Sequence, residues 1–304
     1  MTTPGCSLTA PPEDSFTPAI TRPIAETACR LVGLDATRAV LLRHQTNGVY
    51  QLVTAPVVVK VARPGVRHLR QVVSLVHWLL EQDVPTVPLL EHVVQPLDIE
   101  GYAVTLWRYL PQTRAILAGD IAEPLATLHR APTPPVELPH LDALATIRRS
   151  IERSRILTVE ERAILRGKWE RLTELVPRLG YAQPPRFIHG DPQHRNMLWD
   201  DNADQPVLCD WESAVIGPCE WDLVTIEIHC RRFGRPEPEY RDFCERYGTD
   251  IREWPGYAVL RDLRELRMIT SNARKSAART REAEEVHRRI ARLDAGETEQ
   301  WKIL

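Results

Sequence analysis

The chain has 304 residues, of which 43% are hydrophobic and 26% are charged, and its formal net charge at pH 7 is −2. These values are typical of a globular protein and exclude a disordered or fibrous one. A net charge so close to zero argues against a dedicated nucleic-acid binder, which usually carries a basic excess. The longest apolar runs fall short of the ~20 residues that span a bilayer. The N-terminal segment lacks a basic start followed by an apolar stretch, so we expect a cytoplasmic protein without a secretory signal.

The first part of the chain has the pattern of a β-rich lobe. Residues 1–20 are rich in proline, serine and threonine and are expected to form a disordered or loosely attached tail. Apolar spacing predicts helices over Pro23–Leu34, with Thr21 as N-cap, and over Val66–Leu80. The turn-prone Thr46-Asn47-Gly48 separates two of the expected strands. These strands are Ala39–Arg43, Val49–Val53, Val57–Ala62, Leu89–Val94 and Tyr102–Tyr109.

After Leu110-Pro111 the pattern becomes helical. The predicted helices are Ile121–Leu128, Leu141–Glu152 and Val159–Leu179. The last of them starts at Thr158, with Glu161 three residues on, which is a capping-box pattern. Short strands are expected at Arg186–Ile188, Met197–Trp199 and Val207–Cys209, and mostly helix from Glu220 onward.

Strands first and helices later predict an α+β protein of two lobes. We expect a small N-lobe over residues 21–110, with an antiparallel sheet and one helix, that binds the nucleotide. A larger, mainly helical C-lobe over residues 111–304 is expected to hold the catalytic and acceptor-binding groups. The hinge is expected near Trp107–Pro111.

The six cysteines do not follow the spacing of a structural zinc site, and a chain of this length needs no disulfide framework. We expect reduced thiols. Zinc binding by the cluster from Cys209 to Cys244, together with His229, is the less favoured alternative.

One segment has the composition of a catalytic loop. A short apolar run leads directly into His189-Gly190-Asp191, and Asn196 follows five residues after Asp191. A second apolar run leads into Asp210. Phosphoryl transfer needs a carboxylate to orient or deprotonate the acceptor hydroxyl, and oxygen ligands that hold Mg²⁺ on the nucleotide phosphates. The spacing H-x-D-x-x-x-x-N is that of the protein-kinase catalytic loop. A lone Asp or Asn in a loop is usually a turn residue, but asparagine occurs only four times in this chain and one copy falls at the required offset.

This loop, together with Asp210, resembles the signature of the aminoglycoside phosphotransferase family, small-molecule kinases with a protein-kinase-like bilobal fold. The resemblance extends from about residue 25 to residue 295. It is closest to an actinobacterial branch of the family, through the segments Val207–Leu223 (VLCDWESAVIGPCEWDL), Leu128-His129 and Thr105–Leu110.

The resemblance implies a role for each of these polar residues. Asp191 would be the catalytic base, and Asn196 and Asp210 would be the Mg²⁺ ligands. Asp222 would be a buried carboxylate that braces the loop through its backbone, and His189 is expected to support the geometry of the loop.

Lys60 is the one cation in the apolar run Val57–Ala62. A lysine in a buried strand is costly unless it is paired or bound to an anion, so phosphate contact is favoured over an edge-strand lysine that faces water. Asn47 and Gly48 occupy the place of a phosphate-covering hairpin, or form a simple Asn-Gly turn. Kinase-like proteins usually pair the strand lysine with a glutamate on the next helix, yet residues 70–74 contain no acid. Either Gln71 is a neutral partner or the helix has a different register.

Two further features leave alternatives open. Trp107 and Tyr109 either flank the nucleotide base or are core aromatics on a strand. A scatter of acidic residues forms either an acidic floor for a cationic acceptor or a solvated helix face plus one structural carboxylate. These acids are Glu220, Asp222, Glu227, Glu237, Glu239, Asp242 and Glu245.

The sequence therefore predicts a Mg²⁺-dependent phosphotransferase that moves the γ-phosphate of ATP or GTP to a hydroxyl of a small molecule, such as an aminoglycoside-like antibiotic or an amino sugar. We expect no nucleic-acid, membrane or obligate protein partner. The alternative is a catalytically weak or inactive kinase-like nucleotide-binding module, which the missing glutamate favours and the intact Asp191, Asn196 and Asp210 oppose. Protein kinase activity is disfavoured because Trp211-Glu212, and not Phe-Gly, follows Asp210.

Overall fold

A computed structural model describes residues 16–64, 68–294 and 299–304. The chain divides into two compact units. Unit 1 contains the chain up to Arg114 together with Pro134–Glu137 and Leu198–Glu212. Unit 2 contains Ala115–Thr133, Leu138–Met197 and Ser213–Leu304. Most of the expected N-terminal tail lies outside the described residues.

Unit 1 is built on a five-stranded antiparallel sheet with the order β1-β2-β3-β5-β4. Its strands are β1 (Val40–His44), β2 (Asn47–Gln51), β3 (Val57–Ala62), β4 (Leu97–Ile99) and β5 (Tyr102–Arg108). Side chains alternate across β3, so that Val57, Val59 and Val61 enter the core while Lys60 faces the other side of the sheet. The alternation predicted from the sequence thus sets the direction of the one charged residue in this strand.

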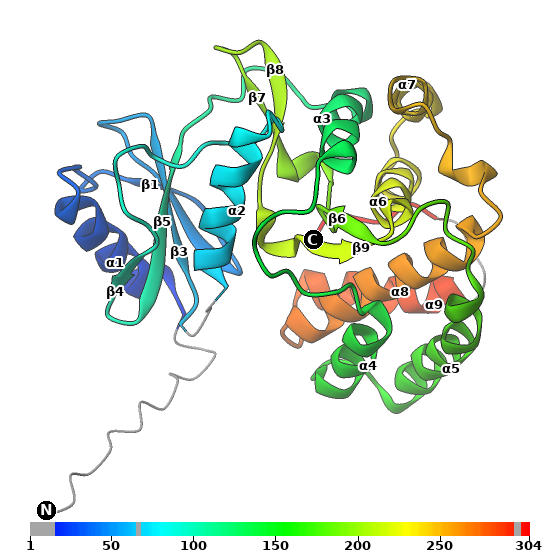
Figure 1. Cartoon of the computed structure of the whole chain (residues 1–304). Helices are drawn as coiled ribbons and strands as arrows, with labels where there is room; N and C mark the ends of the chain where they lie inside the picture. The colour runs from blue at the N-terminus through cyan, green and yellow to red at the C-terminus, as the bar shows by residue number, and fades with distance from the viewer. Residues whose placement is uncertain (1–15, 65–67, 295–298) are drawn as a thin grey trace, which may run out of the picture. The chain divides into compact units, whose positions relative to one another are not determined.

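Helix α1 (Pro18–Leu31) packs against the sheet of unit 1 (Figure 1). The helix starts earlier than predicted because Thr17 is extended and Pro18 takes the first turn, where a proline loses no hydrogen bond. Thr21 is therefore not the N-cap. It is buried inside the helix, and its hydroxyl lies 2.5 Å from the Tyr50 hydroxyl.

The second helix of unit 1, α2 (Leu69–Glu81), follows the predicted apolar pattern. The strand predicted over Leu89–Val94 is wrong. Glu91 and His92 form a turn in which His92 has a φ of 61°, and this turn interrupts the extended run. Only Leu89 forms an isolated bridge, to Trp107.

A separate two-stranded sheet, β7 (Met197–Asp200) with β8 (Gln205–Leu208), confirms the short strands predicted at Met197–Trp199 and Val207–Cys209. Its second strand is held to the rest of unit 1 by backbone hydrogen bonds. The Val87 amide donates to the Leu208 carbonyl at 3.0 Å, and the Leu208 amide donates to the Pro85 carbonyl at 2.9 Å. These bonds fix the point at which the chain enters Asp210.

Unit 2 is mainly helical. Its helix α8 (Tyr257–Lys275) packs against four others (Figure 1): α4 (Ala143–Arg153), α5 (Val159–Leu175), α6 (Cys219–Arg232) and α9 (Arg281–Asp294). Helices α3 (Ala118–Arg130) and α7 (Glu237–Tyr247) pack against each other.

Some elements of unit 2 were predicted from the sequence and one strand was not. The capping box at the start of α5 is confirmed, because Thr158 and Glu161 each accept the other's backbone amide. Strand β6 (Arg186–Ile188) is also confirmed. Its antiparallel partner β9 (Val215–Gly217) was not predicted, because three residues between loops carry no periodic pattern.

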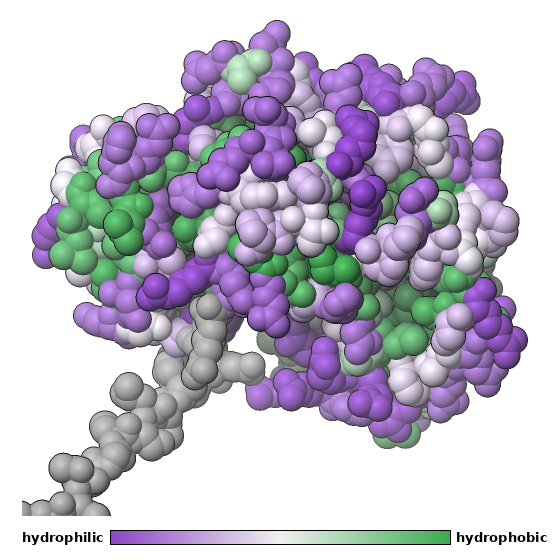
Figure 2. Space-filling model, viewed as in Figure 1, coloured by the Kyte–Doolittle hydropathy of each residue, from purple (hydrophilic) through white to green (hydrophobic). Residues whose placement is uncertain are grey.

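Within the described ranges, no helix combines the length and apolarity needed to cross a membrane. The face shown in Figure 2 is covered largely by hydrophilic residues, with hydrophobic ones in scattered patches.

Unit 2 also encloses a charged cluster. Glu265 on α8 is 2% exposed and accepts hydrogen bonds from Arg232 at 2.7 and 2.8 Å and from Arg231 at 2.9 Å. Burial alone would raise the pKa of Glu265, but the two guanidinium groups, Arg232 first, bring it below its usual range. Its contribution to stability is therefore complete above the unfolded pKa of about 4.3 and is lost as the pH falls through the lowered folded pKa.

Replacing Glu265 by glutamine should lower the free energy of unfolding at pH 7 by about 3–5 kcal/mol, because two arginines lose the buried carboxylate that compensates them. Urea unfolding measures this loss. The difference from wild type should shrink as the pH falls below about 4. Glu245→Gln, on an exposed position of α7, is the matched control, and an equal loss in both variants would contradict the role of the cluster.

Candidate active site

The predicted catalytic loop starts directly after β6 and is held by Asp222, from the first turn of α6. The fully buried Asp222 carboxylate accepts the backbone amides of His189 and Gly190, each at 2.9 Å. His129 Nε2 lies 3.2 Å from the same carboxylate, and its Nδ1 lies 2.7 Å from the Tyr247 hydroxyl. The Asp222 carboxylate is thus positioned to hold the backbone of the loop at His189 and Gly190.

Gly190 is held on its carbonyl side as well. The indole N–H of the buried Trp221 donates to the Gly190 carbonyl at 3.0 Å. Gly190 has a φ of 81°, and a Cβ at this position would lie 2.2 Å from the Ser213 carbonyl oxygen. Only glycine fits both the backbone conformation and this approach. His129 and Trp221 were not predicted as loop supports, because the chain order does not reveal these contacts.

Asp191 is the carboxylate that the braced loop presents. Its Oδ1 accepts from Arg264 Nη2 at 2.5 Å, and its Oδ2 accepts from Gln193 Nε2 at 2.9 Å. Desolvation would raise the pKa of Asp191, but the Arg264 guanidinium outweighs it and holds the pKa below its ordinary value. The side chain is still 27% exposed. Asp191 is therefore an accessible carboxylate anion at neutral pH.

Asn196 closes the same loop. Its amide nitrogen donates to the Asp191 carbonyl at 2.9 Å and approaches Asp191 Oδ2 at 3.4 Å. This orientation leaves the Asn196 Oδ1 without a hydrogen bond from the residues that the structure describes. An amide oxygen with this freedom is a suitable ligand for a hard cation.

His229, from α6, adds a neutral group beside Asp191. Burial and the neighbouring cations lower the pKa of His229 to about 3, although the Asp191 charge opposes this shift. Its ring stacks at a tilt on Phe233, with 4.9 Å between the ring centroids. The histidine is thus uncharged at neutral pH and does not neutralise Asp191. Sequence reasoning considered it only as a zinc ligand.

Lys60 forms the centre of a second group, in unit 1. Its Nζ lies 2.7 Å from Asp210 Oδ1 and 2.7 Å from Glu212 Oε1. Burial opposes the charge on Lys60, but Asp210 and then Glu212 raise its pKa above the usual value. Asn47 donates to both Glu212 oxygens, at 3.2 and 3.1 Å. The acid missing from α2 is therefore supplied by Glu212, while Gln71 is exposed and is not the neutral partner.

Asp210 has a φ of 67°, in a region that non-glycine residues rarely occupy. Such strained backbone persists where the surrounding structure requires it, and it is frequent at functional sites. In addition to Lys60, Arg43 lies 3.8 Å from the second Asp210 oxygen. The carboxylate thus stays 28% exposed and oriented between two cations.

Asn47 and Gly48 do not form the β1–β2 turn. Residues 45 and 46 connect the strands, and Asn47 and Gly48 are buried members of β2. A Cβ on Gly48 would lie 2.8 Å from the Thr21 hydroxyl oxygen, so the glycine allows α1 to approach the sheet. The interpretation as an Asn-Gly turn is wrong, and Asn47 contributes by holding Glu212.

The segment around Trp107 and Tyr109 is tied into the core of unit 1. Trp107 packs on the apolar cluster of Val87, Leu110 and Val207, and its indole N–H donates to the Thr105 hydroxyl at 2.8 Å. The Tyr109 amide donates to the Pro56 carbonyl at 2.8 Å, so it is not available to a nucleotide base.

No three His, Cys, Asp or Glu side chains within residues 16–64, 68–294 and 299–304 are grouped to hold a metal ion. The five cysteines in these ranges form no disulfide bond with one another. Mg²⁺ usually binds one or two protein oxygens and takes its other ligands from water and substrate phosphates. The Asp210 carboxylate and the Asn196 Oδ1 each match that chemistry.

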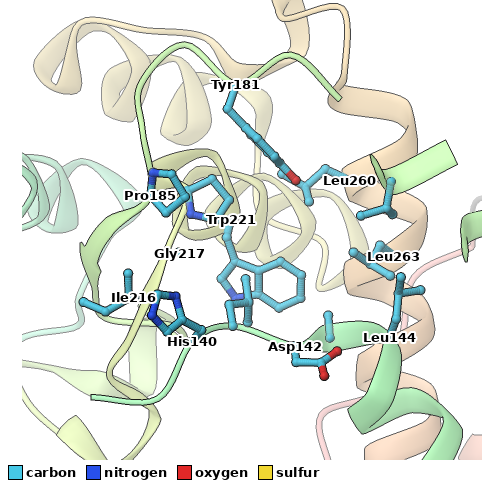
Figure 3. A pocket seen from close by; sticks show the side chains of 14 residues that line it. His140, Asp142, Leu144, Tyr181, Pro185, Ile216, Gly217, Trp221, Leu260 and Leu263 are labelled. Carbon is cyan, nitrogen blue, oxygen red and sulfur yellow. The ribbon is translucent and has the colours of Figure 1, made fainter. Parts of the chain in front are cut away.

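A cavity of about 250 Å³ lies inside unit 2, beside Trp221 (Figure 3). Figure 3 shows the indole between His140 and Ile216 on one side and Leu263 on the other. The cavity lies at Gly217, which pairs with Arg186 at the start of β6, whereas Asp191 follows the end of that strand. The cavity therefore lies at the opposite end of β6 from Asp191.

The scattered acids of α6 and α7 do not form an acidic floor, because six of the seven are engaged by hydrogen-bond donors. Glu220 accepts the Ala182 amide, and Asp222 accepts amides of the predicted catalytic loop. The other pairs are Glu227 with Arg231, Glu237 with Arg252, Glu239 with Arg235 and His194, and Asp242 with Arg246. Glu245 is exposed.

Comparison with known proteins agrees with this geometry. A choline/ethanolamine kinase family protein from Mesorhizobium loti has a TM-score of 0.65 and 15% identity, covering 91% of this chain and 93% of that one. A spectinomycin phosphotransferase solved with ADP and spectinomycin has a TM-score of 0.62 and 13% identity, covering 88% and 93%. An aminoglycoside phosphotransferase from Streptomyces rimosus has a TM-score of 0.58 and 20% identity, covering 81% and 98%.

These likenesses confirm the α+β, protein-kinase-like fold. A search of curated protein sequences gave no significant match. Residues 38–263, well over half of the chain, match the profile of the phosphotransferase enzyme family. The chain therefore belongs to the phosphotransferase enzyme family.

Proposed function

We propose that this protein is a small-molecule kinase that transfers the γ-phosphate of ATP or GTP to a hydroxyl of its acceptor, with Asp191 as the base. The observation that carries the proposal is the braced loop, which holds Asp191 as a partly exposed carboxylate. Family membership supports a small-molecule phosphotransferase. The similar spectinomycin phosphotransferase was solved with ADP, which supports a nucleotide donor.

The acceptor hydroxyl would donate its hydrogen to Asp191 as its oxygen attacks the γ-phosphorus. The new O–P bond forms while the bond from the γ-phosphorus to the bridging oxygen breaks, and the nucleoside diphosphate leaves. A carboxylate with a lowered pKa is a weak base, so Asp191 would mainly orient the hydroxyl and take the proton late.

The remaining residues would stabilise charge on the nucleotide. Lys60 is a fixed cation suited to the phosphates. Asp210 and Asn196 each offer an oxygen to Mg²⁺, which when bound would neutralise phosphate charge. Electrostatic positioning of this kind accounts for most of the rate in phosphoryl transfer.

The inactive-module alternative was favoured by the missing glutamate on α2. Glu212 fills that role by pairing with Lys60 at 2.7 Å. The geometry thus favours an active enzyme.

Asp191→Asn should lower kcat by roughly 100- to 10,000-fold, because the amide cannot accept the hydroxyl proton. Nucleotide turnover with Mg²⁺, across a panel of hydroxylated acceptors, measures this loss. Nucleotide affinity should stay unchanged. Asp204→Asn, in the exposed β7–β8 turn, is the matched control. Equal rates for Asp191→Asn and wild type would refute the base, and nucleotide binding without turnover of any acceptor would establish the inactive module.

Glu212→Gln should weaken nucleotide binding by roughly 10-fold, because Lys60 and Asn47 lose a charged partner. Direct titration with ATP or GTP measures the Kd. Gln71→Ala should leave the Kd unchanged. The reverse outcome, with Gln71→Ala impaired and Glu212→Gln normal, would show that α2 supplies the partner of Lys60 after all.

A further inference from the structure

Helix α8 places two arginines against the catalytic loop. Arg264 and Arg267 are three residues apart and therefore share one face of the helix. Their guanidinium carbons lie 5.0 and 5.1 Å from the centre of the Trp221 ring. Trp221 is the residue that holds the Gly190 carbonyl, so both cations lie beside the loop that carries Asp191.

The two arginines differ in the hydrogen bonds that they donate. Arg264 donates to Asp191 and, at 2.9 Å, to the Thr225 hydroxyl. Arg267 Nη1 is buried and has no hydrogen-bond partner among the described residues. Burial and the Arg264 charge lower the pKa of Arg267 to about 10, although Asp191 opposes them, so Arg267 stays charged at neutral pH. The Trp221 ring gives Arg267 a cation–π contact, but Nη1 still lacks a hydrogen-bond acceptor. A buried cationic N–H group in this state is costly, and such groups often mark a place where a ligand or ion binds.

The surroundings leave this charge uncompensated. Asp191 is the carboxylate that acts on Arg267, and Arg264 already pairs with it. His229 is neutral, and the α6 and α7 acids Glu227 and Glu239 pair with Arg231 and Arg235. Two guanidinium groups thus face one carboxylate, which gives the site beside the base a net positive charge.

We propose that the acceptor of this kinase is an anion, a hydroxyl compound whose own carboxylate or phosphate pairs with Arg267 while its hydroxyl faces Asp191. This inference rests on the proposed function and names its substrate class. The anion would pair with the half-buried Arg267 guanidinium and compensate its charge. A polycationic aminoglycoside would instead place like charges beside Arg264 and Arg267, which disfavours binding.

Matched sets of acceptors that differ only in charge test the proposal with the wild-type protein. One set is glucose, gluconate, glucosamine and a glucose phosphate; another is glycerol, glycerate, aminopropanediol and a glycerol phosphate; aminoglycosides and choline complete the panel. The anionic members should have the higher kcat/KM, and comparison of the carboxylates with the phosphates identifies the group that Arg267 binds. If cationic or neutral members are the better substrates, the inference is wrong but the proposed function stands. If no member is phosphorylated, the proposed function itself fails.

Substitution of Arg267 tests the contact. Arg267→Gln should raise KM for the anionic acceptor by roughly 10- to 100-fold and change KM for the neutral member of the set little. Arg267→Lys should recover part of the loss. Arg274→Gln, an exposed arginine on the same helix, is the matched control. If Arg267→Gln weakens nucleotide binding in the absence of acceptor, the anion is a nucleotide phosphate and the inference is wrong.

Thermal unfolding of the unliganded variants distinguishes a binding role from a structural one. Arg267→Gln removes an uncompensated buried charge, so its Tm should equal or exceed that of wild type. A lower Tm, with the same preference between anionic and neutral acceptors as in wild type, would show that Arg267 only supports Trp221.

Discussion

The position of the loop after β6 in unit 2 depends on the contacts of the buried Asp222 carboxylate. It accepts two consecutive backbone amides at the end of β6, which fixes the direction in which the chain leaves the strand. Trp221, its neighbour on α6, fixes the Gly190 carbonyl that follows these two amides. Because both supports come from one helical turn, the position of α6 determines where Asp191 stands. The reactive carboxylate can then remain partly open to solvent without losing its orientation.

Both units handle buried charge by the same rule, with one instructive difference. Lys60 has two carboxylates within 2.7 Å, and Glu265 has two arginines, so these charges are compensated inside the protein. Arg267 has the Trp221 ring beside its guanidinium, but its buried Nη1 has no hydrogen-bond acceptor among the described residues. A buried cationic group without a hydrogen-bond acceptor lowers the stability of the fold. We attribute it here to binding of the acceptor, because active sites often retain groups that lower stability.

What could be predicted from the sequence was local. The spacing from His189 to Asn196, the alternation around Lys60 and the capping box at Thr158 depend on neighbours in the chain, and each led to a correct local description. The partner of Lys60, the contact from Arg264 to Asp191 and the strand β9 depend on residues brought together over 27 to 152 positions. The prediction of Thr21 as an N-cap is wrong for a similar reason, because its hydroxyl contacts the Tyr50 hydroxyl and does not cap a helix. No periodic pattern records such contacts.

The position of Glu212 has a consequence for control. Protein kinases can be turned off by moving a helix, because that helix carries the acid that holds the strand lysine. Here the lysine is held by two acids on one short segment, Asp210 and Glu212, just after a hairpin that is bonded into the same unit. Displacement of α2 would leave this ion pair intact. In the proposed function, the charges that act on the nucleotide are therefore assembled without a contribution from α2.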